Sequence, residues 1–406
     1  MFGEESHPES TPAAGLGREL SDAARDFSAR LRAEVGTGLE AGHSLELVEN
    51  GRVFDEMERL IARARSTVHL AQYIWRPGKA SDRVLAALFE RARAGVVCRV
   101  LIDSVGSRGR FKPELLARLK TGGCQARLFH PLIWPSLRTL TMRNHRKLLI
   151  VDGEEALTGG WCIWDKWLGD GRSPDHWRDT NIRVRGPAVA HMQMAFEHTW
   201  ITAGGTWLSP RDYAAGPADR QGILAAFVPS DGRREAAGER LAHAFIAAAR
   251  QRLWIASGYF VPDDRIVEAL GARARAGVDV RVLVPGPFHD LPLIRVGQRS
   301  SYPDLLERGV RIWEYQPSMM HAKAFVADGW LSIVGSLNID PQSLNTLAEG
   351  SIVSASPELG AALERSFLAD LEHSQEITSA GSPRSAYSWS TRVVRNALYG
   401  LGRALR

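Results

Sequence analysis

One helix-to-strand unit occurs twice in the chain, and this repeat constrains the fold more than any other feature of the sequence. The segment RARAGVVCRVLID at residues 91–103 resembles RARAGVDVRVLVP at residues 273–285. In each copy a basic amphipathic helix ends at a glycine, Gly95 or Gly277, and a run rich in β-branched residues follows. A buried strand after such a helix is typical of α/β units with largely parallel pairing. The repeat therefore predicts two similar α/β sandwich domains.

The likeness extends on both sides of this unit and sets the expected domain bounds. A length of 406 residues favours two domains. We place the first at 46–207 and the second at 223–376. The stretch LSPRDYAAGPADRQG at 208–222 is rich in proline, glycine and small residues and is the expected linker. Residues 1–45 are expected to form a flexible N-terminal extension, because their start is acidic and broken by prolines.

Composition limits the compartment and the partners. The net charge of +5 mildly favours an anionic partner, either lipid or nucleic acid. Three cysteines without CxxC spacing argue against a disulfide framework or a zinc site, so a reducing compartment is expected. No apolar run approaches the roughly 18 residues of a membrane span, and the N-terminus is unlike a secretory signal. We expect a cytoplasmic protein that can sit on a membrane surface.

A second repeat carries the chemistry. HRKLLIVD in the first half and HAKAFVAD in the second share a histidine, a lysine at +2 and an aspartate at +7. A given histidine meets this spacing by chance roughly once in 300, so two accidental matches are improbable. Seven residues past each aspartate comes a glycine, followed by Gly160 in one copy and Ser336 in the other. The motif residues are His145, Lys147 and Asp152, and His321, Lys323 and Asp328.

The spacing suits displacement at phosphorus. Histidine and lysine two residues apart project from one face of a strand. Two copies around one pocket supply one imidazole that attacks a phosphodiester, a second that donates a proton, and two ammonium groups that neutralise the phosphate. Ser336, Asn338 and Gly160 are the candidates for binding the phosphate oxygens. No metal or other cofactor is expected, since lysine is not a metal ligand.

These motifs strongly resemble the two HxKxxxxD motifs of the phospholipase D superfamily. The resemblance runs from about residue 46 to about residue 375, and within the superfamily the chain looks most like the bacterial cardiolipin synthases without N-terminal membrane spans. It implies two phospholipase D-like domains related by a pseudo-two-fold axis, with one active site at their interface. It also implies that His145 is the nucleophile and His321 the general acid, although the pseudo-symmetry leaves the reverse open.

The same resemblance assigns further residues. Asp179 in HWRDT and Glu349 in NTLAEG match acidic residues that orient the opposing imidazoles, whereas a strand-start cap is the alternative for Asp179. Asp152 and Asp328 belong to the motifs but in the family more often support a loop than touch substrate. Two positions depart from the family pattern. Cys162 stands where asparagine is usual, and Leu347 replaces another asparagine, with Asn345 displaced by two.

The remaining features favour lipid over nucleic acid. The apolar approach to the first motif and the tryptophans of WCIWDKW suit acyl chains at a pocket mouth, with ordinary packing between domains as the alternative. Residues 381–406 carry five arginines and no acidic residue, and helical spacing places four of these arginines opposite a leucine-rich face. We expect an interfacial helix on anionic lipid, although docking on the protein itself is the alternative. No long basic stripe typical of a nuclease lies near either motif.

The leading hypothesis is a phosphatidyltransferase of the cardiolipin synthase type. It moves a phosphatidyl group from phosphatidylglycerol to an alcohol acceptor, expected to be a second phosphatidylglycerol, through a phosphohistidine. The alternatives are a phospholipase D that uses water, a phosphodiesterase or nuclease of the same superfamily, and a lipid-binding pseudoenzyme, which the two intact His-Lys pairs disfavour. No nucleic-acid partner is expected, and the sequence does not predict the oligomeric state.

Overall fold

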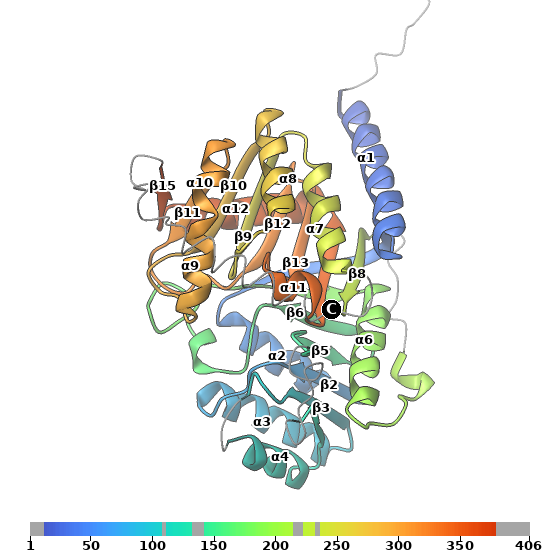
Figure 1. Ribbon diagram of the computed structural model, residues 1–406. Helices are drawn as coiled ribbons and strands as arrows, with labels where there is room; N and C mark the ends of the chain where they lie inside the picture. Colours follow the sequence, from blue (N-terminus) through green and yellow to red (C-terminus); the bar gives the residue numbers. More distant parts are fainter. Residues whose placement is uncertain (1–11, 108–110, 132–141, 214–221, 232–235, 379–406) are drawn as a thin grey trace, which may run out of the picture.

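A single sheet of 15 strands passes through both halves of the chain (Figure 1). The computed structural model describes residues 12–107, 111–131, 142–213, 222–231 and 236–378. Over these residues the strand order is β15-β11-β10-β9-β12-β13-β14-β8-β1-β7-β6-β5-β2-β3-β4. Apart from β15, the order on one side of the central β8-β1 pair repeats the order on the other. The two α/β halves are therefore related by a pseudo-two-fold axis at the middle of the sheet.

The strands correspond in pairs between the halves. The first half contributes β1 (Glu40–Glu49), β2 (Thr67–Gln72), β3 (Val97–Asp103), β4 (Gln125–Phe129), β5 (Leu148–Val151), β6 (Glu155–Gly159) and β7 (Thr180–Arg185). The second contributes β8 (Ile223–Ser230), β9 (Arg252–Ser257), β10 (Asp279–Pro285), β11 (Arg311–Tyr315), β12 (Lys323–Ala327), β13 (Leu331–Gly335), β14 (Glu349–Ala355) and β15 (Ser374–Ile377).

The pairing is mixed, whereas the sequence led us to expect a largely parallel sheet. Among the strands that the structure describes, β2, β3 and β4 pair in parallel, as do β9, β10 and β11. The remaining pairs are antiparallel. The reason is local, because each histidine motif continues directly into a tight turn and a return strand, as in β5-β6 and β12-β13, and such hairpins are antiparallel.

Helices cover both faces of the sheet. One face carries α2 (Arg52–Arg63), α3 (Lys79–Arg93) and α4 (Phe111–Thr121) over the first half, and α7 (Ala237–Ala248), α8 (Asp264–Arg275) and α10 (Tyr302–Glu307) over the second. The opposite face carries α6 (Ala188–Thr202) and α12 (Pro357–Leu371). Residues of α6 and α12 belong to one buried cluster that spans both halves, so this shared core fixes the halves against each other.

The repeated unit forms as its sequence predicts. In α2 the apolar residues recur at helical spacing, and Phe54, Met57 and Leu60 are buried against the sheet. Helices α3 and α8 are each followed by a glycine with positive φ, 88° at Gly95 and 86° at Gly277, which is the left-handed conformation that ends a helix. Each glycine leads directly into a parallel strand, β3 or β10.

The structure differs from our prediction for the N-terminal residues. Pro12–Val35 form helix α1, which packs against α7, and β1 begins at Glu40 rather than at residue 46. Phe27 and Leu31 lie one helical turn apart and are buried in the core of the second half. Because Phe27 and Leu31 are buried, helix α1 is an integral part of the fold rather than a flexible extension.

Several other predictions concern residues that the structure does not describe. The basic segment 381–406 and the apolar stretch 132–141 lie outside the described residues, as do 1–11 and most of the expected linker, 214–221. In the described part of that linker, Pro210–Tyr213 form a short 3-10 helix, η2. None of the described helices combines the length and the apolar character needed to span a bilayer.

Candidate active site

Backbone pairing between the halves places the two histidines. The His145 amide donates to the Ala348 carbonyl over 2.9 Å, and the His321 amide donates to the Arg178 carbonyl over 2.7 Å. Ala348 immediately precedes Glu349, and Arg178 immediately precedes Asp179. The same backbone geometry therefore occurs twice, and each copy sets a histidine of one half beside a carboxylate of the other.

Both imidazoles contact these carboxylates through Nδ1. His145 Nδ1 lies 2.8 Å from Glu349 Oε1, and His321 Nδ1 lies 3.2 Å from Asp179 Oδ2. All four side chains are buried. A carboxylate at Nδ1 fixes the tautomer and the ring orientation, so that Nε2 is the nitrogen left for chemistry.

Glu349 is held as an anion. Its Oε1 accepts a hydrogen bond from Ser343 Oγ over 2.6 Å, and its Oε2 accepts one from Ser336 Oγ. Burial alone would raise the pKa of Glu349, but His145, Lys147 and Ser336 outweigh it and hold the pKa below its ordinary value. The carboxylate beside His145 is therefore ionised at neutral pH.

Asp179 has a different environment. Trp167 Nε1 donates to its Oδ2 over 2.7 Å, and the Thr180 amide donates to its Oδ1 over 2.8 Å. Burial raises the pKa of Asp179 to about 6, although Lys323 and Trp167 act in the opposite direction. The two carboxylates are thus unequal, and the one beside His321 carries its charge less readily.

The histidines themselves are tuned towards the neutral form. Burial lowers the pKa of His145, with Lys147 acting in the same direction and Glu349 against it. Burial, then Lys323 and Lys147, lower the pKa of His321 well below its ordinary value. At neutral pH both imidazoles therefore have available lone pairs, and a bound anion would raise both pKa values again.

The two lysines are fully buried beside their histidines. Lys147 Nζ donates to the His145 carbonyl over 2.6 Å, and Lys323 Nζ donates to the His321 carbonyl and lies 3.0 Å from His321 Nδ1. Burial lowers the pKa of both, that of Lys323 to about 8. Two buried ammonium groups close to both imidazoles make a favourable site for phosphate.

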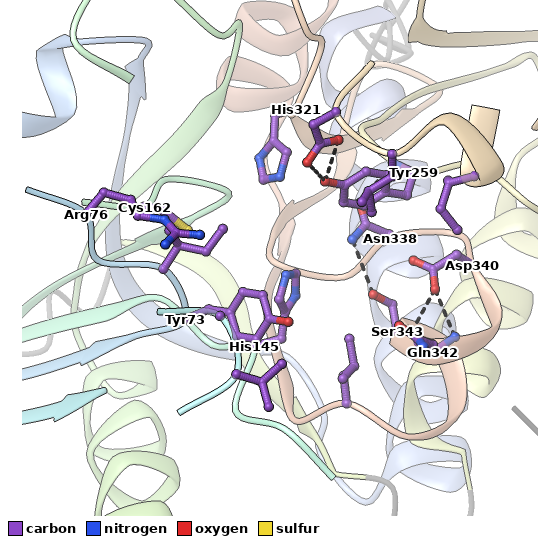
Figure 2. A pocket seen from close by; sticks show the side chains of 17 residues that line it. Tyr73, Arg76, His145, Cys162, Tyr259, His321, Asn338, Asp340, Gln342 and Ser343 are labelled. Atoms are coloured by element: carbon purple, nitrogen blue, oxygen red, sulfur yellow. Dashed lines mark hydrogen bonds between the residues drawn. The ribbon is translucent and has the colours of Figure 1, made fainter. Parts of the chain in front are cut away.

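A cavity of about 310 Å³ opens between the halves and exposes both imidazoles (Figure 2). Of the residues predicted from sequence, His145, His321 and Asn338 line it, together with Cys162. The remaining lining residues are Tyr73, Ile74, Arg76, Val105, Gly106, Tyr259, Asp290, Leu291, Ile294, Asp340, Gln342, Ser343 and Leu347. The wall is polar near Asn338 and Asp340 and apolar at Leu291, Ile294 and Leu347.

Two predicted phosphate ligands have other roles in this geometry. Ser336 is buried and donates to Glu349, so its hydroxyl positions the carboxylate. A Cβ on Gly160 would lie 2.5 Å from Asp179 Oδ1 and 2.8 Å from the His321 carbonyl oxygen. Glycine at this position therefore leaves room for the carboxylate to approach His321. Neither residue is part of the cavity wall.

Asp152 and Asp328 lie away from the cavity, at the far ends of β5 and β12. Asp152 accepts hydrogen bonds from the amides of Arg65, Ser66 and Thr67. Asp328 accepts three from the equivalent segment, which comprises Arg250, Gln251 and Arg252. Both aspartates adopt a positive φ, 55° and 54°. Each carboxylate thus ties the β-hairpin of its motif to the start of the neighbouring strand.

The tryptophans of WCIWDKW do not line the cavity. Trp161 and Trp167 are fully buried, and the Trp167 ring meets the His321 ring edge-on with centroids 5.1 Å apart. Trp177 packs against the same imidazole at 5.3 Å. For Trp167 the alternative of packing between the halves is therefore correct, because Trp167 and Trp177 hold His321 and Asp179 in place. Trp161 belongs to the core of the first half.

Sequence reasoning did not single out the tyrosines of the cavity. The Tyr73 ring meets His145 edge-on at 4.8 Å, and the Tyr259 ring meets His321 edge-on at 5.7 Å. Each also lies under the lysine of its own motif. The repeat could have identified them, because Tyr73 and Tyr259 follow the equivalent strands β2 and β9. Tyr259 additionally donates to Asp290, over 2.9 Å to Oδ2.

Comparisons with known proteins show similarity in both halves of the chain. A family model described as "Cardiolipin synthase, PLD-like domain" matches residues 57–200 and 243–371, one segment in each half. The chain is 33% identical over 329 residues to a cardiolipin synthase of Geobacillus kaustophilus, covering 80% of this chain and 64% of that protein. It is 34% identical over 322 residues to cardiolipin synthase 2 of Bacillus anthracis, covering 78% and 62%. The chain thus spans less than two thirds of the length of these relatives.

Two solved structures share the fold. A phosphatidylserine synthase of Haemophilus influenzae superposes with a TM-score of 0.68 at 13% identity, covering 95% of this chain and 98% of that one. A polyphosphate kinase of Porphyromonas gingivalis superposes with a TM-score of 0.56 at 14% identity, covering 89% and 53%. At these identities the likeness establishes the architecture alone.

Proposed function

Because the chain belongs to the phospholipase D-like cardiolipin synthase family, we propose that it transfers a phosphatidyl group from phosphatidylglycerol to the hydroxyl of a second phosphatidylglycerol. The observation that carries the proposal is the cross-half geometry, in which Glu349 orients His145 and Asp179 orients His321 around one cavity. One imidazole on each side of a phosphorus atom is what an in-line displacement through a covalent intermediate requires.

In the first step His145 Nε2 attacks phosphorus and the bond from phosphorus to the glycerol oxygen breaks. The ionised Glu349 stabilises the positive charge that develops on the attacking ring. His321 Nε2 carries a proton once the phosphodiester anion is bound, and it donates this proton to the departing alkoxide. Glycerol leaves, and the phosphatidyl group stays on His145 as a phosphohistidine.

In the second step the same groups act in reverse. His321 Nε2, now neutral, removes the proton from the hydroxyl of the acceptor, whose oxygen attacks phosphorus. The bond from His145 to phosphorus breaks, which releases the diphosphatidyl product and restores both rings. Lys147 and Lys323 offset the charge on the non-bridging oxygens in both steps.

The cavity wall supports an alcohol acceptor in preference to bulk water. Asp290 and Asp340 provide carboxylate oxygens that can accept hydrogen bonds from the hydroxyls of a glycerol headgroup. Leu347, which stands where the family usually has asparagine, adds an apolar wall beside them. We further propose that the protein acts at the membrane surface, where both substrates reside, with residues 381–406 as one contact.

Product analysis tests this function. The protein is incubated with vesicles of phosphatidylglycerol that carries one label in the acyl chains and another in the headgroup glycerol. We expect diphosphatidylglycerol and one free glycerol for each product molecule formed. Phosphatidic acid as the main lipid product would contradict the transferase assignment in favour of hydrolysis. Cleavage of DNA without lipid turnover would contradict the substrate class.

A further inference from the structure

Helix α9 (Pro292–Ser300) and the turn before it expose an apolar surface beside the cavity. Of the eight large hydrophobic residues that are exposed in the described part of the chain, four lie within nine positions. They are Phe288, Leu291, Leu293 and Val296, with exposed fractions of 38%, 47%, 66% and 39%. We call these four residues the α9 patch. Clustering of this kind on a protein surface marks an interaction site.

The orientation of α9 is the reverse of that of an ordinary surface helix. Its buried residues are Gly297, Gln298 and Ser300, whereas Leu293 and Val296 face outward. The reversal is held by hydrogen bonds, because Gln298 Nε2 donates to the Pro285 carbonyl and to Tyr302 Oη over 2.9 and 2.8 Å. The helix is thus fixed with its apolar side outward.

The patch is continuous with the candidate active site. Leu291 of the patch and its neighbour Ile294 both line the cavity that exposes the two histidines. Helix α9 follows β10, at the edge of the sheet where the parallel strands end and ligands of α/β proteins bind. An apolar ligand that crosses the α9 patch would therefore reach the imidazoles without leaving protein surface.

The volume of the cavity indicates which part of a phospholipid it can hold. About 310 Å³ is at the lower end of the roughly 300–1,000 Å³ typical of small-molecule sites. Such a volume suits phosphate and glycerol groups, whereas four acyl chains of two phospholipids must remain outside. Those chains extend from the cavity mouth, and the α9 patch borders the cavity at Leu291.

We propose that the α9 patch is the surface that inserts into the lipid bilayer and holds the cavity mouth against it. This inference rests on the proposed function, since it takes phospholipid as the substrate. Leu291 and Leu293 reach the acyl region, and the headgroup passes between Leu291 and Ile294 to the histidines. The patch then determines which part of the protein faces the membrane, independently of any anchor elsewhere in the chain.

Site-specific labelling tests the proposal directly. The native cysteines Cys98, Cys124 and Cys162 are buried, so a single introduced cysteine can be labelled selectively with an environment-sensitive fluorophore. Leu293→Cys probes the patch. Leu368→Cys is the matched control, because Leu368 of α12 is 42% exposed, belongs to the opposite face of the sheet and does not line the cavity.

With phosphatidylglycerol vesicles we expect a blue shift and a several-fold gain in emission at position 293, and no change at position 368. Leu293→Asp should lower vesicle binding and turnover on vesicles by at least tenfold, while cleavage of a monomeric short-chain phosphatidylglycerol stays within twofold. A position-293 label that remains in water on protein-bound vesicles would overturn the proposal. Insertion of the label at position 293 without formation of diphosphatidylglycerol would support membrane insertion of the α9 patch and would contradict the proposed function.

Discussion

The carboxylate of Glu349 in the second half lies 2.8 Å from Nδ1 of His145 in the first half. The reciprocal contact, from Asp179 to His321, is longer at 3.2 Å, and Nδ1 of His321 also lies 3.0 Å from Lys323 Nζ. Because neither half holds both members of a pair, a separate half has no complete site. The inequality of the two pairs gives a physical basis for assigning different roles to the two histidines.

Leaving-group chemistry separates these roles. Glu349→Gln should lower kcat by roughly 10²- to 10⁴-fold for every substrate, because the attacking ring loses its stabilising charge. Asp179→Asn should be nearly as damaging with phosphatidylglycerol. With a phosphatidyl ester of p-nitrophenol the rate of the first p-nitrophenol release, measured in a single turnover, should be much less affected, since that leaving group needs no proton. Equal losses with both substrates for Asp179→Asn would contradict the assignment of His321 as the acid.

The pH profile should report Lys323. Its pKa is lowered to about 8, so its charge is present below pH 8 and is lost as the pH rises through that value. We therefore expect kcat/KM, which reflects the free enzyme, to fall on the alkaline side with an apparent pKa near 8. Lys323→Arg should reduce activity but remove this limb, because guanidinium stays protonated. If the alkaline fall of kcat/KM is unchanged in Lys323→Arg, a group other than Lys323 causes it.

Gly160 tests how closely Asp179 must approach His321. Gly160→Ala adds a methyl group that collides with the carboxylate and with the His321 carbonyl, which must shift by several tenths of an ångström. We expect turnover to fall by about 10²-fold. Ser336→Ala is the matched variant at the equivalent position, where a hydrogen bond to Glu349 is lost but no atom is added, and its loss should be smaller. Activity of Gly160→Ala within a few-fold of the unmodified chain would refute this role.

Asp152 should matter for stability more than for chemistry. Burial alone would raise the pKa of Asp152, but hydrogen bonds from the amides of Thr67, Arg65 and Ser66 outweigh it and lower the pKa. Asp152→Asn should cost about 1–3 kcal/mol in the free energy of unfolding while leaving kcat of the folded protein largely intact. Denaturant titrations and initial rates measure the two effects.

The sign of this effect depends on pH. A carboxyl whose pKa is lower in the folded state stabilises the fold above its unfolded value, which is about 4, and loses that contribution as the pH falls through the folded value. The stability difference between Asp152→Asn and the unmodified chain should therefore be full at pH 7 and shrink below about pH 4. A difference that grows at low pH would be inconsistent with the hydrogen bonds described.

Much of the site follows from sequence because it depends on strand periodicity. His145 and Lys147 lie two residues apart next to a strand, and the repeat supplies His321 and Lys323 in the same relation. Their convergence on one site, however, depends on backbone pairing such as that of His145 with Ala348, which joins residues about 200 positions apart. No local pattern encodes such a pairing. For the same reason the sequence did not predict that β1 and β8 would join the halves into one sheet.

Other features were missed because tertiary contacts override local pattern. The proline-broken start suggested a flexible extension, yet Phe27 and Leu31 are buried under α7. The tryptophans Trp161 and Trp167 suggested a membrane interface but are buried, Trp161 in the core of the first half and Trp167 against His321. In α9 the helical pattern alone would bury Leu293, whereas the hydrogen bonds of Gln298 turn that side outward.

Detection of a covalent phosphohistidine on His145 tests most directly whether His145 is the nucleophile. His321→Ala is mixed with a labelled phosphatidyl ester of p-nitrophenol, quenched with alkali, and digested for mass spectrometry of the modified peptide. We predict stoichiometric labelling of His145, which accumulates because the general base of the second step is absent, and no labelling in His145→Ala. Label on His321 in His145→Ala would contradict the assignment of His145 as the nucleophile. An unmodified His145 in a protein that still turns over the ester would contradict it as well.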